Sequence, residues 1–496
     1  MTAQSSSSLS TIAHDRHVAI RSALVLGASL LVTWSVGLLV RLYLPNFLGP
    51  TRFGTYSFAE SFPLAIFGLL SLGVDTYIQK EIPVRPEHAS DFFGGVVVVR
   101  VVMSALLLAG IAATLAISGR SSEIQLVVFV FGLAQFFVQH NGTLAALLQA
   151  TRAVGGLAFV NVASKILWGA GTFVAILAHA PLVTIAASFC VAEIVKAIVL
   201  HRLARRHLGL RARVDLGAVR RVVIACLPYY LNTVAIGIYA KIDISIVNFV
   251  SNDEETGWYG AAQSLAGIAM LLAPLMGSVL LPLLSRVASR SHDELKATLR
   301  RTIETISAMT IPVSLMMCIG ADVAVRYALG QRFMPATASV MILAPMFVLT
   351  YLAMILCTFL YLIDRSWTVT VISLSALVID SVANLFLIPH TLRRFGTGGA
   401  GIGASIVLVA TEVLVVLVLG QIIGWRTWLD RQNVKVIGTS IAIALVVAAA
   451  DRALASIGPL RLVIDGALYL ALASLTGALN IKQILGAVLS ARRSEA

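Results

Sequence analysis

The sequence predicts an all-α polytopic membrane protein with about fourteen transmembrane helices in two six-helix lobes plus an extra C-terminal helix pair. Hydrophobic residues make up 58% of the chain and charged residues only 12%, whereas a soluble domain has about 25% charged residues. The few charges cluster between apolar runs long enough to cross a bilayer. An internal repeat with an offset of about 200 residues divides these runs into two sets of six.

The apolar runs give the expected position of each span. In chain order they lie at 21–44, 55–78, 92–118, 123–148, 156–178, 181–203, 219–249, 257–284, 303–326, 336–362, 367–389, 399–424, 434–450 and 461–481. No small-residue cleavage site follows the first run, so we expect it to be a retained helix and not a cleaved signal peptide. The last pair is shorter and lies outside the repeat.

The repeat is clearest where one span ends and the next begins. The stretch Arg41–Phe62 returns as Asp243–Leu265. At an offset of 202, Asn46 and Phe47 align with Asn248 and Phe249, and after a one-residue insertion Gly54, Tyr56, Ala59 and Ser61 align with Gly257, Tyr259, Ala262 and Ser264. Six spans per copy keep both copies in one orientation, which predicts a pseudo-two-fold axis along the membrane normal with the pathway between the lobes.

The repeat and the loops predict the division of the chain. We expect a disordered cytoplasmic N-terminus at 1–20, an N-lobe at 21–203, a basic cytoplasmic linker at 204–218, a C-lobe at 219–424, and the last two spans with a cytoplasmic tail at 425–496. Segments on the N-terminal side of the membrane hold 24 Lys and Arg residues and the opposite side holds 8. The positive-inside rule therefore places both termini in the cytoplasm.

Several function classes are excluded by composition and motif. The net charge of +13 reflects basic cytoplasmic loops and no basic face with interleaved aromatics, so we expect no nucleic-acid partner. The four cysteines lie inside apolar runs without metal-ligand spacing. There is no Walker motif, and the loops are too short for a catalytic domain. We therefore expect neither an enzyme nor an ATP-driven pump.

Charges inside the membrane are expensive and point to function. Arg41 lies near the outer end of the first span, while Arg100 and Lys165 lie eight or nine residues inside their spans, about 12–13 Å deep. With Lys241 in the seventh span, these cations form the predicted substrate-binding set. Arg and Lys at such depth favour an anionic substrate held as phosphate usually is.

The second half carries the predicted ion-coupling residues. They are Asp243, Asp380, Asn384 and Glu412. Lys241 and Asp243 are two residues apart and do not share a helix face, whereas Asp380 and Asn384 are four apart and do. Carboxylate and amide oxygens suit a small cation such as sodium, and a lone acid suits a proton. A buried polar pair that bonds to adjacent helices is an equally good interpretation.

Four segments carry a resemblance over nearly the whole chain. They are RLYLPNFLGPTRFGTYSFAE at 41–60, LPYYLNTVAIGIYAKIDISIV at 227–247 with GWYGAAQSL at 257–265, YALGQRFMPA at 327–336, and NLFLIPHTLRRFGTGGAGIGAS at 384–405. In order and spacing the chain resembles the bacterial flippases for lipid-linked oligosaccharides. These are the polysaccharide-biosynthesis branch of the multidrug/oligosaccharidyl-lipid/polysaccharide exporter superfamily.

The resemblance implies alternating access between two lobes around a cationic cavity that binds an undecaprenyl-diphosphate-linked oligosaccharide, driven by an ion gradient or the membrane potential. It implies a monomer in the bacterial inner membrane. The resemblance implies no cofactor beyond a coupling sodium ion or proton. It also implies polysaccharide polymerase and other biosynthetic membrane proteins as partners. Arg41 matches a cavity arginine, and Asp243, Asp380, Asn384 and either Thr411 or Glu412 match a sodium site by helix. The extra helix pair implies a lipid-facing groove.

Two rival transporters remain within the same superfamily. A cation-coupled multidrug antiporter usually has twelve spans and an acidic first-lobe cavity, and Arg100 and Lys165 argue against it. A lipid II flippase usually has several cavity arginines, which are not evident here. The sequence therefore favours an O-antigen, capsule or exopolysaccharide repeat unit as the substrate.

Overall fold

The computed structural model describes residues 3–75, 78, 89–150, 154–209, 214–269, 284–285, 287–288 and 291–477, and within these ranges the regular structure is entirely helical. This confirms the all-α fold class. The helices pack into two compact units, residues 1–245 and 246–496.

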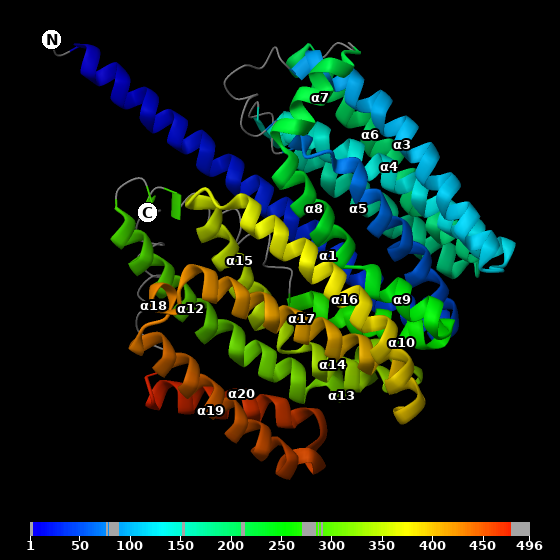
Figure 1. The fold of residues 1–496 in the computed structure, drawn as a ribbon, viewed down its shortest axis with the longest axis vertical. Helices are drawn as coiled ribbons and strands as arrows, with labels where there is room; N and C mark the ends of the chain where they lie inside the picture. Colours follow the sequence, from blue (N-terminus) through cyan, green and yellow to red (C-terminus); the bar gives the residue numbers. More distant parts are fainter. Residues whose placement is uncertain are drawn as a thin grey trace. The chain divides into compact units, whose positions relative to one another are not determined.

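Unit 1 is a bundle of long helices, seen in Figure 1. Its elements are α1 (Ala3–Phe67), η1 (Gly68–Ser71), α3 (Ala89–Ile117), α4 (Ser122–Ala150), α5 (Val154–Leu177), α6 (Leu182–Leu208), α7 (Leu216–Ala225), α8 (Leu227–Tyr239) and the start of α9 (Ile242–Val250). Helix α4 packs against α3 and α6, and α5 packs against α1 and α6. Leu144, Leu147 and Leu200 lie in the apolar core of this unit.

Helix α1 contains most of the first two predicted spans and breaks between them. Gly49 has φ 72° and ψ 171°, outside the helical region, and Pro50 follows it. A glycine adopts this backbone conformation without the steric penalty of a side chain. At its other end α1 begins at Ala3, although residues 1–20 were expected to be disordered. No Gly or Pro precedes Gly27, so the helix nucleated by the apolar run extends backwards one hydrogen bond at a time.

The aligned copies of the repeat have similar local structure. Gly49 aligns with position 251, and there the chain breaks again, because α9 ends at Val250 and α10 begins at Asp253. The aligned Tyr56 and Tyr259 are both buried, as are Ala59 and Ala262. The repeat thus reproduces a helix–break–helix unit, while the pseudo-two-fold relation of the lobes stays a prediction.

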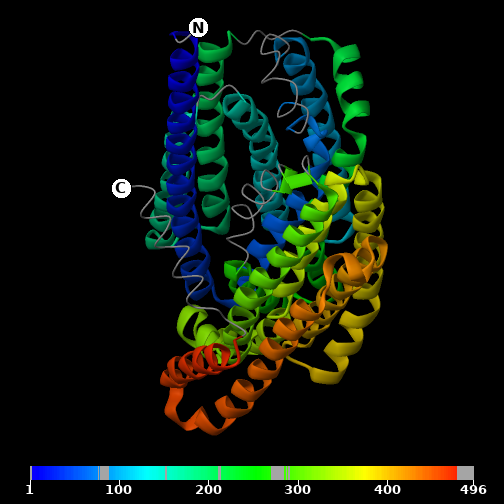
Figure 2. The ribbon, with the colours of Figure 1, turned by 90° about the vertical axis from the view of Figure 1, so that its left-hand side faces the viewer.

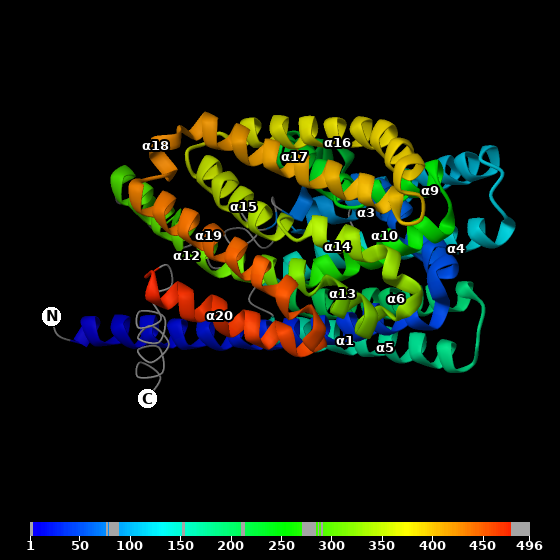
Figure 3. The ribbon, with the colours of Figure 1, turned by 90° about the horizontal axis from the view of Figure 1, so that it is seen from below.

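Unit 2 contains the second set of helices. They are the rest of α9, α10 (Asp253–Ala269), α12 (His292–Ile319), α13 (Ala321–Ala324), η4 (Val325–Leu329), η5 (Gln331–Ala336), α14 (Thr337–Leu343), α15 (Met346–Leu362), α16 (Ser366–Phe395), α17 (Gly399–Ile423), α18 (Trp425–Trp428), α19 (Arg431–Leu454), η6 (Ala455–Leu460) and α20 (Arg461–Leu475). Helices α16 and α17 pack along each other, with α15 against α17 (Figure 3). Helices α19 and α20 form a hairpin that packs against α12 (Figure 2).

Ten helices in the described part of the chain are long and apolar enough to cross a membrane, and up to twelve if each bent pair counts as one span. One bent pair is Tyr230–Tyr239 with Ile242–Val250, at 42°, and the other is Gln331–Leu343 with Met346–Leu362, at 40°. Helix α1 counts once here although it holds two predicted spans. Positions 270–283 of the eighth span, 478–481 of the last span and the tail after them lie outside the described residues. The count of fourteen therefore stays a prediction.

The two units do not coincide with the predicted lobes. Their boundary lies after Ser245, inside the seventh predicted span, whereas the sequence predicted a linker at 204–218. The reason lies in packing: α7 packs against α3, and α8 packs against α1 and η1, so these helices belong to unit 1. Of the predicted linker, residues 210–213 lie outside the described residues.

Candidate functional site

Three of the four predicted cations belong to one electrostatic group in unit 1. Lys165 on α5 interacts with the charges of Arg41 and Glu60, both on α1. Lys241, in the turn between α8 and α9, interacts with the same two residues and with Asp243. Arg41 is exposed and both lysines are partly exposed. The fold therefore gathers cations from three separate stretches of chain around the broken helix α1.

Aromatic rings and a carboxylate hold Lys165 in this group. Its Nζ lies 4.4 Å from the ring centroid of Trp168 and 5.8 Å from that of Phe189, both within cation–π range. The carboxylate of Glu193 also interacts with the ammonium group. Glu193 is 7% exposed and accepts a 2.9 Å hydrogen bond from Nδ2 of Asn141. Lys165 is thus a positioned charge beside a fixed carboxylate.

The sequence reasoning missed the carboxylates of this group. It counted the cations of the first half and overlooked Glu60 and Glu193, although both lie inside predicted spans. Two signals pointed to them: Glu60 ends the motif at 41–60, and Glu193 stands three residues before Lys196, on the same helix face. The group therefore has mixed charge, with carboxylates that interact with both lysines, and it is not a purely basic surface.

Arg100 has a different environment. Its side chain is 1% exposed and makes four hydrogen bonds. Nε donates to the carbonyl of Leu70 at 2.6 Å, one terminal nitrogen donates to Ser71 O at 3.1 Å, and the other donates to Gln139 O at 3.1 Å and to Thr143 Oγ1 at 2.9 Å. A guanidinium has five N–H groups, so one remains for any other ligand.

The bonds of Arg100 secure the end of η1. The carbonyls of a helix end lack intrahelical partners, and Arg100 supplies donors to two of them. Directly after them, Leu72 and Gly73 have left-handed backbones with φ of 54° and 67°. Thr143 extends the network by donating to Asp75 at 3.0 Å. This geometry favours a structural role for Arg100, and its role in substrate binding stays a prediction.

The predicted ion-coupling residues are all buried. Asn384 Nδ2 donates to Asp380 Oδ2 at 3.0 Å, and both side chains are 0% exposed, so the expected shared helix face exists. Glu412 is 6% exposed on the adjacent α17 and interacts with Cys357 on α15, and Thr411 is 3% exposed. Asp243 is 0% exposed, belongs to unit 1, and its Oδ1 accepts the N–H of Ile244 at 2.8 Å.

The ligand chemistry of these residues is sparse for a metal ion. Within the described ranges, no three His, Cys, Asp or Glu side chains gather around one point. The Asp380–Asn384 pair offers one carboxylate and one amide group, whereas hard cations such as Ca²⁺ bind six to eight oxygens. A proton on Asp380 needs no such shell.

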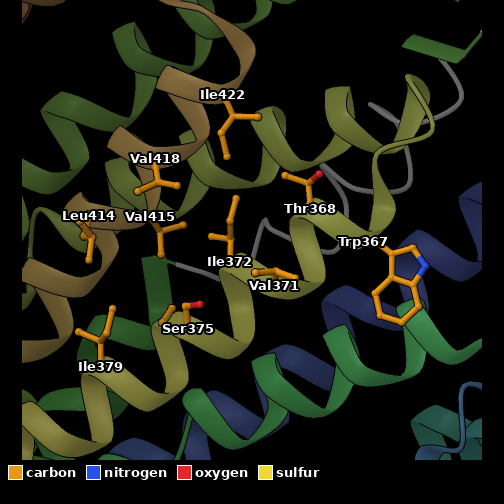
Figure 4. A pocket seen from close by; sticks show the side chains of 11 residues that line it. Trp367, Thr368, Val371, Ile372, Ser375, Ile379, Leu414, Val415, Val418 and Ile422 are labelled. Atoms are coloured by element: carbon orange, nitrogen blue, oxygen red, sulfur yellow. The ribbon is translucent and has the colours of Figure 1, made fainter.

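An apolar groove of about 570 Å³ lies between α16 and α17 (Figure 4). Its lining is aliphatic except for Trp367, Thr368 and Ser375. The other lining residues are Val371, Ile372, Ala376, Ile379, Leu414, Val415, Val418 and Ile422. Because no charged side chain lines it, the groove suits a hydrocarbon chain and not a charged headgroup.

Glu255 ties the start of α10 to the hairpin of α16 and α17. Its Oε1 accepts the N–H of Gly398 at 2.7 Å and its Oε2 accepts that of Ala400 at 3.0 Å, at the beginning of α17. A carboxylate there satisfies open donors and complements the helix dipole. Burial nevertheless raises the pKa of Glu255, while the backbone N–H groups, including that of Gly401, oppose the shift.

Comparisons with known proteins agree with this architecture. The solved structure "Lipid II flippase MurJ, inward closed conformation" matches at 15% identity, with a TM-score of 0.67, covering 92% of this chain and 98% of that one. A multidrug resistance MATE family transporter of the MOP superfamily, in its inward-facing conformation, matches at 14% identity, with a TM-score of 0.61, covering 79% and 98%. The fold is therefore that of these transporters.

The comparison with curated proteins found no match. The sequence pattern of the family described as "Polysaccharide biosynthesis protein" matches residues 19–288, more than half of the chain. This agrees with the resemblance carried by the segments at 41–60 and 227–247. The chain therefore belongs to the polysaccharide biosynthesis protein family.

Proposed function

We propose that this protein carries an undecaprenyl-diphosphate-linked oligosaccharide, such as an O-antigen, capsule or exopolysaccharide repeat unit, from the cytoplasmic to the periplasmic leaflet of the bacterial inner membrane. Family membership supports a role in polysaccharide biosynthesis. The observation that carries the proposal is the group of Arg41, Lys165 and Lys241, whose charges suit a diphosphate. The glycan stays with the diphosphate and the polyprenyl tail stays in lipid.

Ion coupling follows from the buried acids. A proton or sodium ion at Asp380 and Asn384, at Glu412 or at Asp243 changes the relative stability of inward-open and outward-open states. An ion drives such a change only by the difference in its affinity for the two states. The carboxylate of Asp380 can hold a proton, and with the amide oxygen of Asn384 it offers oxygen ligands to a sodium ion. The membrane potential acts on the same charges.

The carboxylates beside the cations contribute selectivity in this proposal. Glu60 and Glu193 balance the lysines when no substrate is bound, which lowers the energy of burying the charges. A diphosphate that enters competes with these carboxylates for Lys165 and Lys241. The same carboxylates favour the second candidate, a cation-coupled drug antiporter, because they offer partners for a cationic drug.

The test uses the full-length protein in liposomes. Translocation of a short-chain undecaprenyl-diphosphate oligosaccharide is measured with and without a proton or sodium gradient. Gradient-dependent appearance of the glycan on the far leaflet supports the flippase and identifies the ion. Translocation of lipid II alone indicates a lipid II flippase, and gradient-driven efflux of a cationic dye without glycan transport indicates the drug antiporter.

Charge reversal tests the cationic group directly. Lys165→Glu and Arg41→Glu should each abolish glycan transport while the protein stays folded and inserted. Lys435→Glu is the matched control, because Lys435 is exposed on α19 and should transport normally. If both reversals transport at the wild-type rate, the diphosphate does not bind at this group.

A further inference from the structure

The α19–α20 hairpin packs against α12 within unit 2 (Figures 2 and 3). A cluster of charged side chains connects this hairpin to α12 and α13. Arg461 opens α20 and is 8% exposed. Its guanidinium nitrogens lie 2.9 Å from Asp451 Oδ1 on α19 and 2.6 Å from Asp322 Oδ1 on α13. It also donates to the carbonyl of Ile319, the last residue of α12, at 3.1 Å. One guanidinium thus joins four elements.

Asp465 lies one turn after Arg461 on α20. It is 0% exposed, and among the described residues neither of its carboxyl oxygens receives a hydrogen bond. Its carboxyl group lies within hydrogen-bonding range of the carboxyl group of Asp451. An ionised carboxylate only accepts hydrogen bonds, so two of them cannot bond to each other. A positively charged species must therefore lie between the two carboxyl groups.

The charges around the pair identify the missing partner as cationic and small. Three carboxylates surround the single guanidinium, which leaves two negative charges uncompensated if all are ionised. Among the described residues, the other titratable group that interacts with the pair is the thiol of Cys318 on α12, and the phenol of Tyr469 lies one turn after Asp465 on α20, next to Ser440. Neither is cationic. Two like charges that share a buried site do not both ionise.

We propose that Asp451 and Asp465 bind one proton between them, forming a proton-binding site at the end of the α19–α20 hairpin. A proton needs only the two carboxyl oxygens that meet there. The described residues form no group of three His, Cys, Asp or Glu side chains that could bind a metal ion, and the adjacent guanidinium of Arg461 would repel one. The carboxylate of Asp322 is about half exposed, so it links the cluster to solvent and provides a route for the proton.

The bound proton stabilises the hairpin in its position on α12. With the proton, Asp465 donates to Asp451, and Asp451 keeps its contact with Arg461. Without it, repulsion between the carboxylates opposes the contact of α20 with α19. The folded protein thus binds one more proton than the unfolded chain near neutral pH, so its stability falls as pH rises through the apparent pKa of the pair. This site is independent of the transport proposal.

The experiment uses the full-length protein in lipid nanodiscs. Infrared spectra in H₂O and D₂O detect the carbonyl stretch of a protonated carboxylic acid, and thermal unfolding gives Tm from neutral to alkaline pH. The variants are Asp465→Asn and Asp451→Asn. The control is Asp364→Asn, because Asp364 is exposed.

The protonated-acid band should be as strong in Asp364→Asn as in the wild type, and in the other two variants it should be weaker by the component that titrates with the pair. In wild type the unfolding equilibrium constant should rise about tenfold per pH unit as pH approaches the apparent pKa of the pair from below, and it should become independent of pH above that pKa. Asp465→Asn should lose this dependence while it keeps Tm near the wild-type value at neutral pH, since asparagine donates as the protonated acid does.

Three results would overturn the proposal. One is an unchanged band in both variants. Another is displacement of the band by sodium at constant pH, which would assign the site to a metal ion. The third is failure of Asp465→Asn to fold, because a residue that is neutral in the native protein accepts this replacement.

Discussion

Replacing Arg100 with methionine tests whether this deep cation supports the fold or binds substrate. Methionine fills much of the same space but donates no hydrogen bond. The change leaves the carbonyls of Leu70, Ser71 and Gln139 without their donor, and each buried unpaired group costs about 1–3 kcal/mol. It also removes the cation that interacts with Asp75.

Partial relaxation offsets part of this loss, so we expect destabilisation of about 3–5 kcal/mol, as for a broken buried ion pair. That corresponds to a loss of roughly two to four powers of ten in the ratio of folded to unfolded protein. Since a native protein is stable by only about 5–15 kcal/mol, Arg100→Met should be poorly expressed and should unfold at a clearly lower temperature.

The assay is thermal unfolding followed by size-exclusion chromatography in detergent, with transport measured in parallel. Arg365→Met is the control, because Arg365 is exposed. It should keep the wild-type Tm. If Arg100→Met has the wild-type Tm and fails only in transport, the structural role is wrong and Arg100 belongs to the substrate site.

The remaining predictions concern stability. Glu255→Ala removes the acceptor at the start of α17 and should lower the free energy of unfolding by about 1–2 kcal/mol, measured by thermal unfolding. The control Glu254→Ala, at an exposed neighbouring residue, should leave the stability unchanged. Equal effects of the two variants would contradict the capping role of Glu255. Burial raises the pKa of Glu255 above its usual value of 4.5, so the folded state keeps the carboxyl proton to higher pH than the unfolded chain does. The stabilisation that this proton gives the folded state is therefore full below about pH 4.5 and falls as pH rises through the raised pKa. Glu255→Gln should lack this pH dependence, and a curve of Tm against pH identical to that of the wild type would refute the titration of Glu255. Asn141→Leu leaves the carboxylate of Glu193 without its amide donor and should lower stability by about 1–3 kcal/mol, which a wild-type Tm would disprove.

Part of the site was predictable because it is local. Asp380 and Asn384 are four residues apart on one helix, so helix geometry alone brings the amide to the carboxylate. The sequence predicted a cationic cavity of Arg41, Arg100, Lys165 and Lys241, which stays a prediction, and it did not predict the carboxylates that interact with the two lysines. A count of cations by span has no means of showing which acid on another helix lies beside them.

The sequence by itself determined the all-α membrane class, the helix break in each copy of the repeat and the family. Each follows from local chemistry: a single chain segment crosses a bilayer only if its own backbone satisfies its hydrogen bonds, and Gly49 followed by Pro50 interrupts the helix in the first copy. The tertiary structure decided the partners of the buried charges. Arg100 binds carbonyls 29–39 residues away, and Glu255 binds backbone groups 143 and 145 residues away. A charge in a low-dielectric interior takes whichever donor or acceptor packing brings to it, and packing depends on the entire chain.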